Sequence, residues 1–317
     1  EVNNLRDDKL IRSYEMSMSD TYQKDVLLNT KSKHWSMFYE PNKFGSKIKL
    51  EDLKDFRSNN SGLSRGLDDS FDNELSFKVF SDLASKVGYE FLYSNLQENN
   101  IGNSHNLLRY RDKYLDYNRL FHISWFKELE DKVFSKNSFW ESANGKPLFC
   151  EIGGGFGSFS QLIIANKDIK LLCMDLPEAN ILSSYYLSRN FPDKSFFLYD
   201  DYINSGKNLT QEIVDKYDIM ILPPFCKIDS SVKISLFSNT RSMMEMDFKI
   251  VCAYFEFIQK HIAENGYFLN VNRYEKRTVG EAIRIHEYPY DSKWKGISSE
   301  SSFSQPHIHL LLTKRIF

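Results

Sequence analysis

The chain has 317 residues, of which 41% are hydrophobic and 26% are charged, so it can bury the core of one large or two small domains. Its 41 basic and 43 acidic side chains give a net charge of −2, which argues against a long electrostatic contact with nucleic acid. No apolar run approaches the roughly 18 residues that a membrane span requires.

The chain begins with Glu1 rather than Met, so a longer parent chain is left open, and its first thirty residues lack the basic-then-apolar order of a signal peptide. Its four cysteines show no CxxC pairing, and two of them lie in apolar, strand-like runs. We therefore expect small buried thiols in a reducing compartment, with the cytoplasm as the location, rather than a zinc site. The cysteines are Cys150, Cys173, Cys226 and Cys252.

Residues 1–115 are predicted to form a largely helical accessory region or lid. A polar, loop-like stretch leads into "DNELSFKVFSDLASKVG", where Leu75, Val79, Leu83 and Val87 recur at steps of four. This spacing predicts a helix with one buried stripe, and Gly88 stands where a C-terminal cap belongs.

Residues 116–317 are predicted to form the second domain, beginning with a further helix. The segment "YLDYNRLFHISWFKELEDKVF" carries apolar side chains at helical spacing. These side chains are Leu120, Ile123, Phe126, Leu129 and Val133.

From residue 147 onward, apolar strand-like runs alternate with helical stretches. The runs are "LFCEI", "KLLCMD", "SFFLY", "DIMIL", "KISLFS", "GYFLNVN" and "HIHLLLT". This alternation predicts a Rossmann-like α/β fold: a mostly parallel, seven-stranded sheet covered by helices, with an antiparallel last strand. Either "SFFLYDDY" or "DIMILPPF" is the third strand, and we favour the second because its spacing to "LFSNT" is more typical.

A glycine-rich stretch, "EIGGGFG", follows the first of these strands and leads into a helix. A dinucleotide fingerprint would need glycine at position 156 or 158, where the chain has Phe156 and Ser158, and no phosphate-binding Gly-Lys-Ser/Thr follows. The spacing of the glycines therefore argues against a nicotinamide or flavin oxidoreductase. Glycines in such a loop let the backbone turn sharply and approach a ligand. They are Gly153, Gly155 and Gly157.

Two acids flank this loop and favour S-adenosylmethionine as the ligand. Glu151 precedes the glycines and suits the ammonium of a methionine moiety, whereas it would repel a pyrophosphate. Asp175 ends the second strand, where a carboxylate can accept hydrogen bonds from both ribose hydroxyls. The alternative is a tight strand–helix turn that binds nothing. We assign four further residues to the cofactor pocket: Leu176, Pro224, Phe225 and Asn239. Of these, Pro224 and Phe225, together with Cys226, are expected to lie against the adenine ring.

The chain resembles the bacterial sugar O-methyltransferase family, a branch of the class I S-adenosylmethionine-dependent enzymes, over most of residues 100–315. The resemblance rests on "EIGGGFG", "DLPE" with "LSSYYLSRNFP", "LPPF", "SNTRSMMEM" and "YPYDSKW". It implies methyl transfer to a hydroxyl of a bacterial glycan, a nucleotide-sugar or a glycosylated metabolite, as in polysaccharide biosynthesis. "DLPE" is also similar to plant phenol O-methyltransferases, but their catalytic His-Asp segment has no counterpart in "TRSMMEMD".

A sugar hydroxyl is weakly acidic, so a positioned base is expected. Glu245 and His286 are the candidates, although Glu245 and the less favoured Asp247 also suit the first turn of a helix. Arg241 and Arg273, with Asn239, are candidate ligands of sugar hydroxyls or of a phosphate. His122 is interpreted as a packing residue. No acidic cluster with metal-ligand spacing follows the fourth strand, so we predict no metal.

Two alternatives stay open beside a sugar O-methyltransferase. One is a methyltransferase acting on a phenol, a carboxylate or an amine. The other is a cofactor-binding module that works by interaction, without turnover, in a larger assembly. The expected partner is a sugar-containing small molecule or glycan, and a homo-oligomer is left open.

Overall fold

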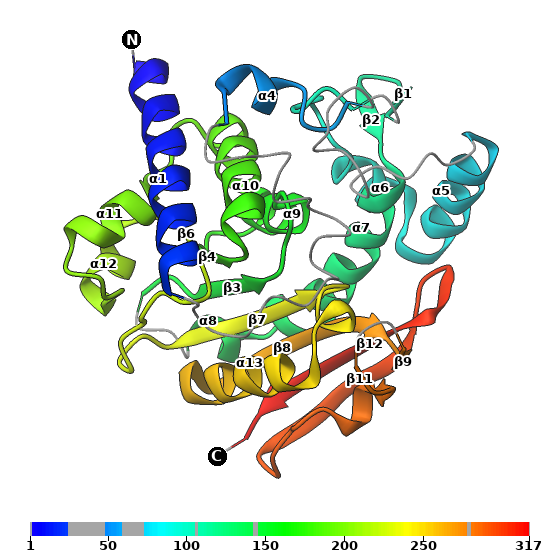
Figure 1. Cartoon of the computed structure of the whole chain (residues 1–317). Helices are drawn as coiled ribbons and strands as arrows, with labels where there is room; N and C mark the ends of the chain where they lie inside the picture. Colours follow the sequence, from blue (N-terminus) through cyan, green and yellow to red (C-terminus); the bar gives the residue numbers. More distant parts are fainter. Residues whose placement is uncertain are drawn as a thin grey trace.

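A computed structural model describes residues 2–24, 48–58, 73–104, 107–141, 145–277 and 280–316, and centres on one eight-stranded sheet (Figure 1). The strand order is β11-β12-β8-β7-β3-β4-β6-β5. β3, β4, β5, β6, β7 and β8 are parallel, whereas β12 runs antiparallel to both of its neighbours. The strands are β3 (Leu148–Ile152), β4 (Lys170–Met174), β5 (Phe196–Phe197), β6 (Ile219–Leu222), β7 (Ile234–Thr240), β8 (Ile262–Arg273), β11 (Trp294–Ser302) and β12 (Gln305–Arg315).

Two short hairpins lie outside this sheet: β1 (Leu108–Tyr110) with β2 (Lys113–Leu115), and β9 (Glu275–Lys276) with β10 (Ile283–Arg284). The α-helices are α1 (Val2–Lys24), α4 (Leu50–Lys54), α5 (Asn73–Val87), α6 (Tyr89–Ser94), α7 (Tyr117–Leu129), α8 (Asn137–Glu141), α9 (Ser158–Asn166), α10 (Pro177–Asn190), α11 (Tyr199–Asn204), α12 (Gln211–Lys216) and α13 (Phe248–His261). A π-helical turn, η1 (Glu130–Phe134), continues α7, and two 3₁₀ turns are η2 (Met243–Glu245) and η3 (Ile285–Glu287).

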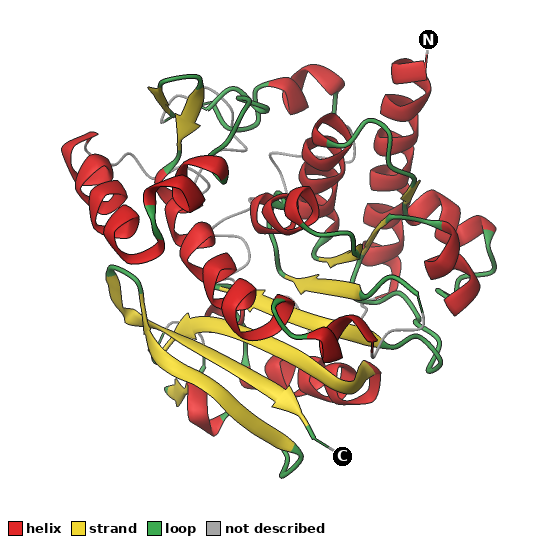
Figure 2. Ribbon diagram, turned by 180° about the vertical axis from the view of Figure 1, so that it is seen from behind, coloured by secondary structure: helices red, strands yellow, loops and turns green. Residues whose placement is uncertain are grey.

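Helices cover both faces of the sheet, which confirms the Rossmann-like α/β class (Figures 1 and 2). Alternate residues of a strand face opposite sides, so β4 directs Leu171 and Cys173 to one cluster and Leu172 and Met174 to the other. The first cluster packs against α7, α9 and α10, and the second against α11, α12 and α13. Strands buried on both faces read as continuous apolar runs, which is why β3 is buried at every position.

The sheet has eight strands rather than the predicted seven, because the hairpin strand β11 was missed. Its sequence, "WKGISSESS", is polar, and most of its side chains are exposed or half-buried at the edge of the sheet. The seven predicted runs all form strands, and β12 is antiparallel as expected. β6 lies beside β4, which confirms "DIMIL" as the third strand. The run "SFFLY" pairs over only two residues before α11 begins.

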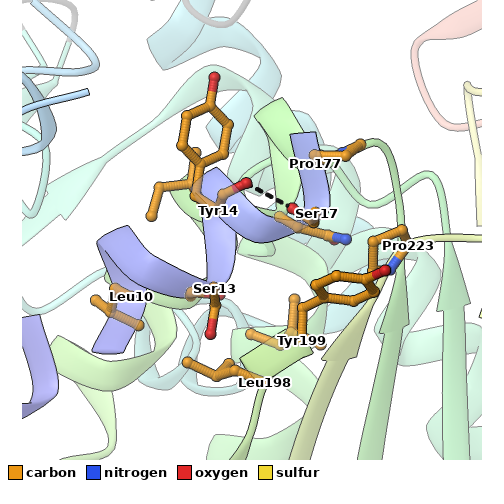
Figure 3. A pocket seen from close by; sticks show the side chains of 12 residues that line it. Leu10, Ser13, Tyr14, Ser17, Pro177, Leu198, Tyr199 and Pro223 are labelled. Atoms are coloured by element: carbon orange, nitrogen blue, oxygen red, sulfur yellow. Dashed lines mark hydrogen bonds between the residues drawn. The ribbon is translucent and has the colours of Figure 1, made fainter. Parts of the chain in front are cut away.

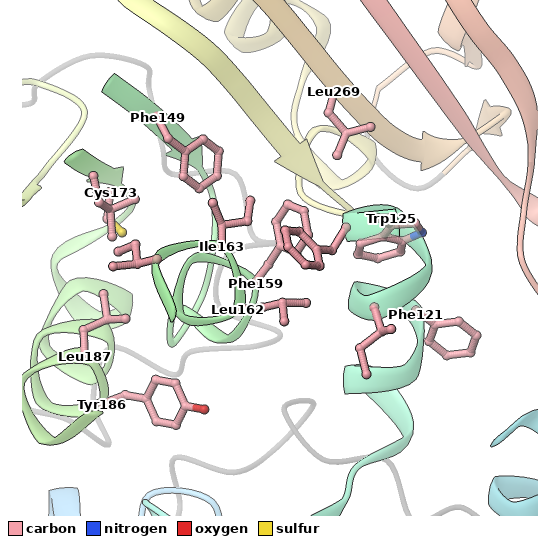
Figure 4. Close-up of a cluster of buried hydrophobic side chains, with 14 of the residues drawn as sticks. Phe121, Trp125, Phe149, Phe159, Leu162, Ile163, Cys173, Tyr186, Leu187 and Leu269 are labelled. Atoms are coloured by element: carbon pink, nitrogen blue, oxygen red, sulfur yellow. The ribbon is translucent and has the colours of Figure 1, made fainter. Parts of the chain in front are cut away.

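Both helices predicted upstream of the sheet are present. In α5, Val79 and Leu83 are buried, but Leu75 is 41% exposed, so the predicted stripe is wrong at its first position. Gly88, with φ +90°, ends that helix as expected. All five apolar side chains predicted for the next helix are buried, four of them in α7 and Val133 in η1. Figure 4 shows Phe121 and Trp125 of this helix on the side of α9 that carries Phe159 and Leu162.

The region before residue 116 shares its core with the sheet. One buried cluster contains Leu10 of α1, Leu83 of α5, Leu162 of α9 and Leu269 of β8. The α1 helix lies against α10 and α11, and three ion pairs of 2.6 Å fix its polar face. They join Asp7 to Arg189, Lys9 to Asp201, and Arg12 to Asp200. Within the described ranges, no helix combines the length and apolarity that a bilayer crossing requires.

Candidate active site

The glycine loop joins β3 to α9, and its three glycines have φ values of +60° to +85°. The three differ in what a side chain would meet. A Cβ on Gly153 would lie 2.0 Å from Ser242 Oγ, and a Cβ on Gly157 would lie 3.3 Å from Leu187 Cδ1. A Cβ on Gly155 would meet nothing within 4 Å. The chain's own packing therefore requires glycine at Gly153 and is tight at Gly157, and of the three only Gly155 faces open space.

Asp175 lies directly against the open side of this loop. Its Oδ2 accepts a hydrogen bond of 2.8 Å from the Gly155 N–H, and its Oδ1 accepts one of 2.7 Å from Leu176, the residue that precedes α10. Burial raises the pKa of Asp175 to about 6, although these two N–H groups oppose the shift. The carboxylate thus stands at the carboxyl end of β4, where a ligand in the crevice of an α/β sheet is bound.

Glu151 lies beneath the loop and is fully buried. Its Oε2 accepts hydrogen bonds from the N–H and hydroxyl of Ser160, whereas its Oε1 has no hydrogen-bond partner among the described residues. Burial raises the pKa of Glu151 to about 7. A buried carboxylate with one vacant acceptor oxygen fits a cationic or hydrogen-bond-donating ligand group.

The Glu151 carboxyl predicts a specific dependence of stability on pH. The folded chain holds this proton more tightly than the unfolded chain, so its stabilisation is present at low pH and is lost as the pH rises towards about 7. Relative to Glu151→Gln, the free energy of unfolding of the wild type should fall by on the order of 3 kcal/mol over that interval. Chemical denaturation at several pH values measures this. If the free energies of unfolding of the wild type and of Glu151→Gln change with pH in parallel, the prediction is contradicted. The control is Glu264→Gln, at an exposed site on β8.

The region before residue 116 reaches the glycine loop through Phe156. The Phe56 ring meets the Phe156 ring edge-on at a centroid distance of 5.6 Å, and the Arg57 guanidinium lies 4.9 Å from the centre of that ring. Arg57 also forms a buried ion pair of 2.8 Å with Asp116, whose other oxygen caps α7 at the N–H of Asn118. The segment 48–58 is thereby fixed to both the loop and α7.

The residues predicted to contact adenine follow β6. Pro224 and Phe225 are half-buried, and the Phe225 ring packs edge-on against Tyr199 at 5.8 Å. Beside them lies a cavity of about 20 Å³, enough for about one water molecule. Figure 3 shows Pro177, Pro223 and Tyr199 facing the α1 residues that close this cavity.

Asn239 is engaged within the chain itself. Its amide donates to the Ile152 carbonyl oxygen at 2.8 Å, and its Oδ1 accepts from the Met243 N–H and the Asn272 amide, each at 2.9 Å. These bonds fix the segment after β7 to the end of β3. The structure therefore gives Asn239 a positioning role, at a fully buried site, rather than one at the open side of the loop.

The segment after β7 brings a polar set next to the glycine loop. Ser242 packs against Gly153, and Glu245 follows in η2, half-buried. Burial raises the pKa of Glu245, while the charges of Arg241 and Arg273 lower it, which places both cations near this carboxyl. Arg241, Glu245 and Arg273 are separate candidates in the sequence. The pairing of β7 with β8 brings the ends of these two strands together.

The two histidines lie in different surroundings. His286 is exposed in η3, where its ring lies 5.9 Å from that of Tyr274. His122 packs against Trp125 and Phe159 as expected, but its Nδ1 also lies 3.2 Å from Ser158 Oγ at the start of α9. Burial lowers the pKa of His122 to about 3, so this imidazole is neutral at physiological pH.

Two other predicted groups form hydrogen bonds within the chain. Asp247 caps α13 by accepting from the Lys249 N–H at 2.9 Å. Arg241 donates to Asn118 Oδ1 at 3.4 Å and so joins the end of β7 to the start of α7. Cys150 and Cys173 are buried, as expected, and no disulfide joins any of the four cysteines within the described residues. Over the described ranges, no group of three or more His, Cys, Asp or Glu side chains is placed to hold a metal ion.

Comparison with known proteins gives a likeness of fold only. The sequence matches no protein-family profile and no curated protein. Among solved structures, an O-methyltransferase family 2 protein from Planctomyces limnophilus DSM 3776, in complex with apigenin, has 11% identity and a TM-score of 0.41 over 81% of this chain and 67% of that one. A geranyl diphosphate methyltransferase, in complex with GPP and sinefungin, has 11% identity and a TM-score of 0.41 over 64% and 80%.

An amino pentose methyltransferase from Micromonospora echinaspora, with S-adenosylmethionine bound, has 8% identity and a TM-score of 0.36 over 59% of this chain and 90% of that one. At such identities no ligand or activity is carried over from these proteins to this chain. The assignment of a ligand rests on the site itself.

Proposed function

We propose that this protein is an S-adenosylmethionine-dependent methyltransferase that acts on a sugar hydroxyl. The observation that carries the proposal is a glycine loop with an open face at Gly155, which donates to the Asp175 carboxylate, and with Glu151, whose Oε1 has no partner among the described residues, beneath the neighbouring Gly154. A cofactor with two ribose hydroxyls and an ammonium group suits these acceptors. A pyrophosphate does not, because both flanking groups are acids and the glycine frame differs from the dinucleotide fingerprint.

The loop and the ends of the strands around it would each hold one part of this cofactor. Asp175 would accept the ribose hydroxyls, Glu151 would accept the ammonium group, and Pro224 and Phe225 would lie against the adenine. Gly155 would allow the backbone to approach the ligand without a Cβ between them. Bound S-adenosylmethionine supplies an electrophilic methyl group on a sulfonium centre.

The acceptor would lie between η2 and α7. Arg241, Arg273 and Glu245 come from the carboxyl ends of β7 and β8, and Asn118 and His122 come from the start of α7. Such a polar set suits an acceptor with several hydroxyl groups better than a phenol, which an aromatic slot would bind. This favours the sugar over the alternative acceptors, and we assign the general base to Glu245.

Replacing Glu245 by Gln should lower kcat about 100-fold, because the amide cannot take the proton of the acceptor hydroxyl. Affinity for S-adenosylhomocysteine should stay unchanged. In the wild type, kcat/KM should fall as the pH drops through the raised pKa of this carboxyl, that is, above the range of an ordinary glutamate. A steady-state pH profile measures both effects. A full rate in Glu245→Gln, with His286→Gln inactive, would move the base to His286.

The function itself is tested by methyl transfer. The protein is incubated with S-adenosylmethionine and, in separate reactions, a nucleotide-sugar, a free monosaccharide and a phenol, and release of S-adenosylhomocysteine is measured. Product formation with a sugar acceptor supports the proposal. Turnover with the phenol alone would establish the second type of acceptor, and cofactor binding without any turnover would favour an interaction module.

A further inference from the structure

A second polar cavity lies between residues 94–99 and the helices α9 and α10, separate from the glycine loop. Its volume is about 340 Å³, which is at the lower end of the range of small-molecule sites. None of Gly155, Asp175 and Glu245 lines it. Its walls are mainly side-chain amides together with one buried guanidinium: Asn95, Gln97, Gln161, Asn166, Asn190 and Arg119.

Two of these amides have buried oxygens that no described residue hydrogen-bonds. Gln97 is 4% exposed, and its Nε2 donates to the Tyr186 hydroxyl at 3.1 Å, whereas its Oε1 has no hydrogen-bond partner in the described part of the chain. The Gln161 Oε1, on α9, is buried and unpartnered in the same sense. Buried polar atoms are nearly always paired, so two unpaired oxygens in side chains that line the cavity leave unused hydrogen-bonding capacity in its wall.

The walls are fixed in place without a ligand. Asn166 donates to Asn95 Oδ1 at 2.9 Å, and Asn99 donates to Asn190 Oδ1 at 3.1 Å, so residues 94–99 are joined to both α9 and α10. Arg119 is buried and donates to the carbonyl oxygens of Asn95 and Ser158, each at 2.9 Å. A preformed site binds with a small loss of conformational entropy.

The charges and the amides select the class of ligand. The buried Arg119 disfavours a cation, and vacant carbonyl oxygens disfavour an anion. Glu98, the acid that lines the cavity, is 78% exposed and is paired with Lys113. A hydroxyl group both donates and accepts, so it satisfies a glutamine amide in either of its two orientations. We propose that this cavity binds a neutral, hydroxyl-rich unit, namely a single sugar residue.

The proposal is independent of methyl transfer, because binding here is measured without the cofactor. Saturation-transfer difference NMR is recorded with glucose, galactose, rhamnose and N-acetylglucosamine, and with choline and inorganic phosphate as cationic and anionic probes. The blocking variant is Ala165→Trp, which places an indole in the cavity from an exposed position of α9. Its matched control is Ala282→Trp, at an exposed position that does not line the cavity.

At least one sugar should give a saturable signal, which Ala165→Trp weakens at least about tenfold and Ala282→Trp leaves unchanged. Gln161→Leu, which removes one vacant oxygen, should weaken it by about the same factor. The proposal is overturned if no sugar binds, if Ala165→Trp leaves the signal intact, or if choline or phosphate is the probe that Ala165→Trp displaces. Affinity for S-adenosylhomocysteine, measured on Ala165→Trp, should equal that of the wild type and reports separately on the proposed cofactor site.

Discussion

Replacing Asp175 by Ala is expected to weaken binding of S-adenosylhomocysteine about 100-fold, on the order of 3 kcal/mol. The carboxylate would accept two ribose hydroxyls, and each hydrogen bond to a charged group contributes more than a neutral one. The same carboxylate holds the Gly155 N–H at 2.8 Å, so the variant also loosens the loop on its ligand side. Calorimetric titration measures the affinity, and a thermal melt measures the stability.

Little stability should be lost, because Asp175 is only half-buried and Gly155, whose N–H is freed, faces open space. Asp193→Ala, at an exposed position after α10, makes the same chemical change away from the loop and should bind as the wild type does. Equal affinities in Asp175→Ala and Asp193→Ala would show that Asp175 does not contact the ligand.

Replacing Gly155 by Val is expected to abolish measurable binding of S-adenosylhomocysteine while the chain still folds. A Cβ at this position meets no protein atom within 4 Å, so the branched side chain would occupy the space assigned to the cofactor. The backbone φ of +60° adds strain of about 1–2 kcal/mol for a residue with a Cβ. Calorimetric titration and circular dichroism measure the two effects.

Gly206→Val is the matched control for this strain. Gly206 has φ +89°, and a Cβ there also meets nothing within 4 Å, but it lies in the turn after α11. It should lose a similar amount of stability and keep its affinity. Normal binding by Gly155→Val would mean that the ligand does not lie against this glycine.

Replacing Gly153 by Ala should lower the stability of the chain. Its Cβ would lie 2.0 Å from Ser242 Oγ, so the variant should melt at a lower temperature, and Ser242→Gly in the same chain should restore part of the loss. Thermal melts of the single and double variants measure this. An additive loss in the double variant would contradict the contact.

The buried strands, and the glycine loop that follows one of them, could be predicted from the sequence. Strands such as β3 and β6 are covered on both faces, so each reads as a continuous apolar run whatever its neighbours are. The edge strand β11 gives no such signal, because its polar side chains face solvent and its pairing with β12 is made by the backbone. Local pattern cannot reveal a strand of that kind.

The site was only partly predictable, because its parts come from distant segments. The position of Glu151 and Asp175 around the loop follows from strand order alone. The contact between Gly153 and Ser242 and the approach of His122 to Ser158 depend on tertiary packing across long stretches of chain. Asn239 looked like a cofactor ligand from its place at a strand end, but the three partners of its amide are visible only in the folded chain.

The most direct test of the account is a calorimetric titration of the purified protein with S-adenosylhomocysteine, with NAD as the control. We expect binding at about micromolar concentration for the first and none for the second. Binding of NAD, or no heat from S-adenosylhomocysteine with a chain that melts cooperatively, would contradict the assignment of the loop between Glu151 and Asp175 to this cofactor.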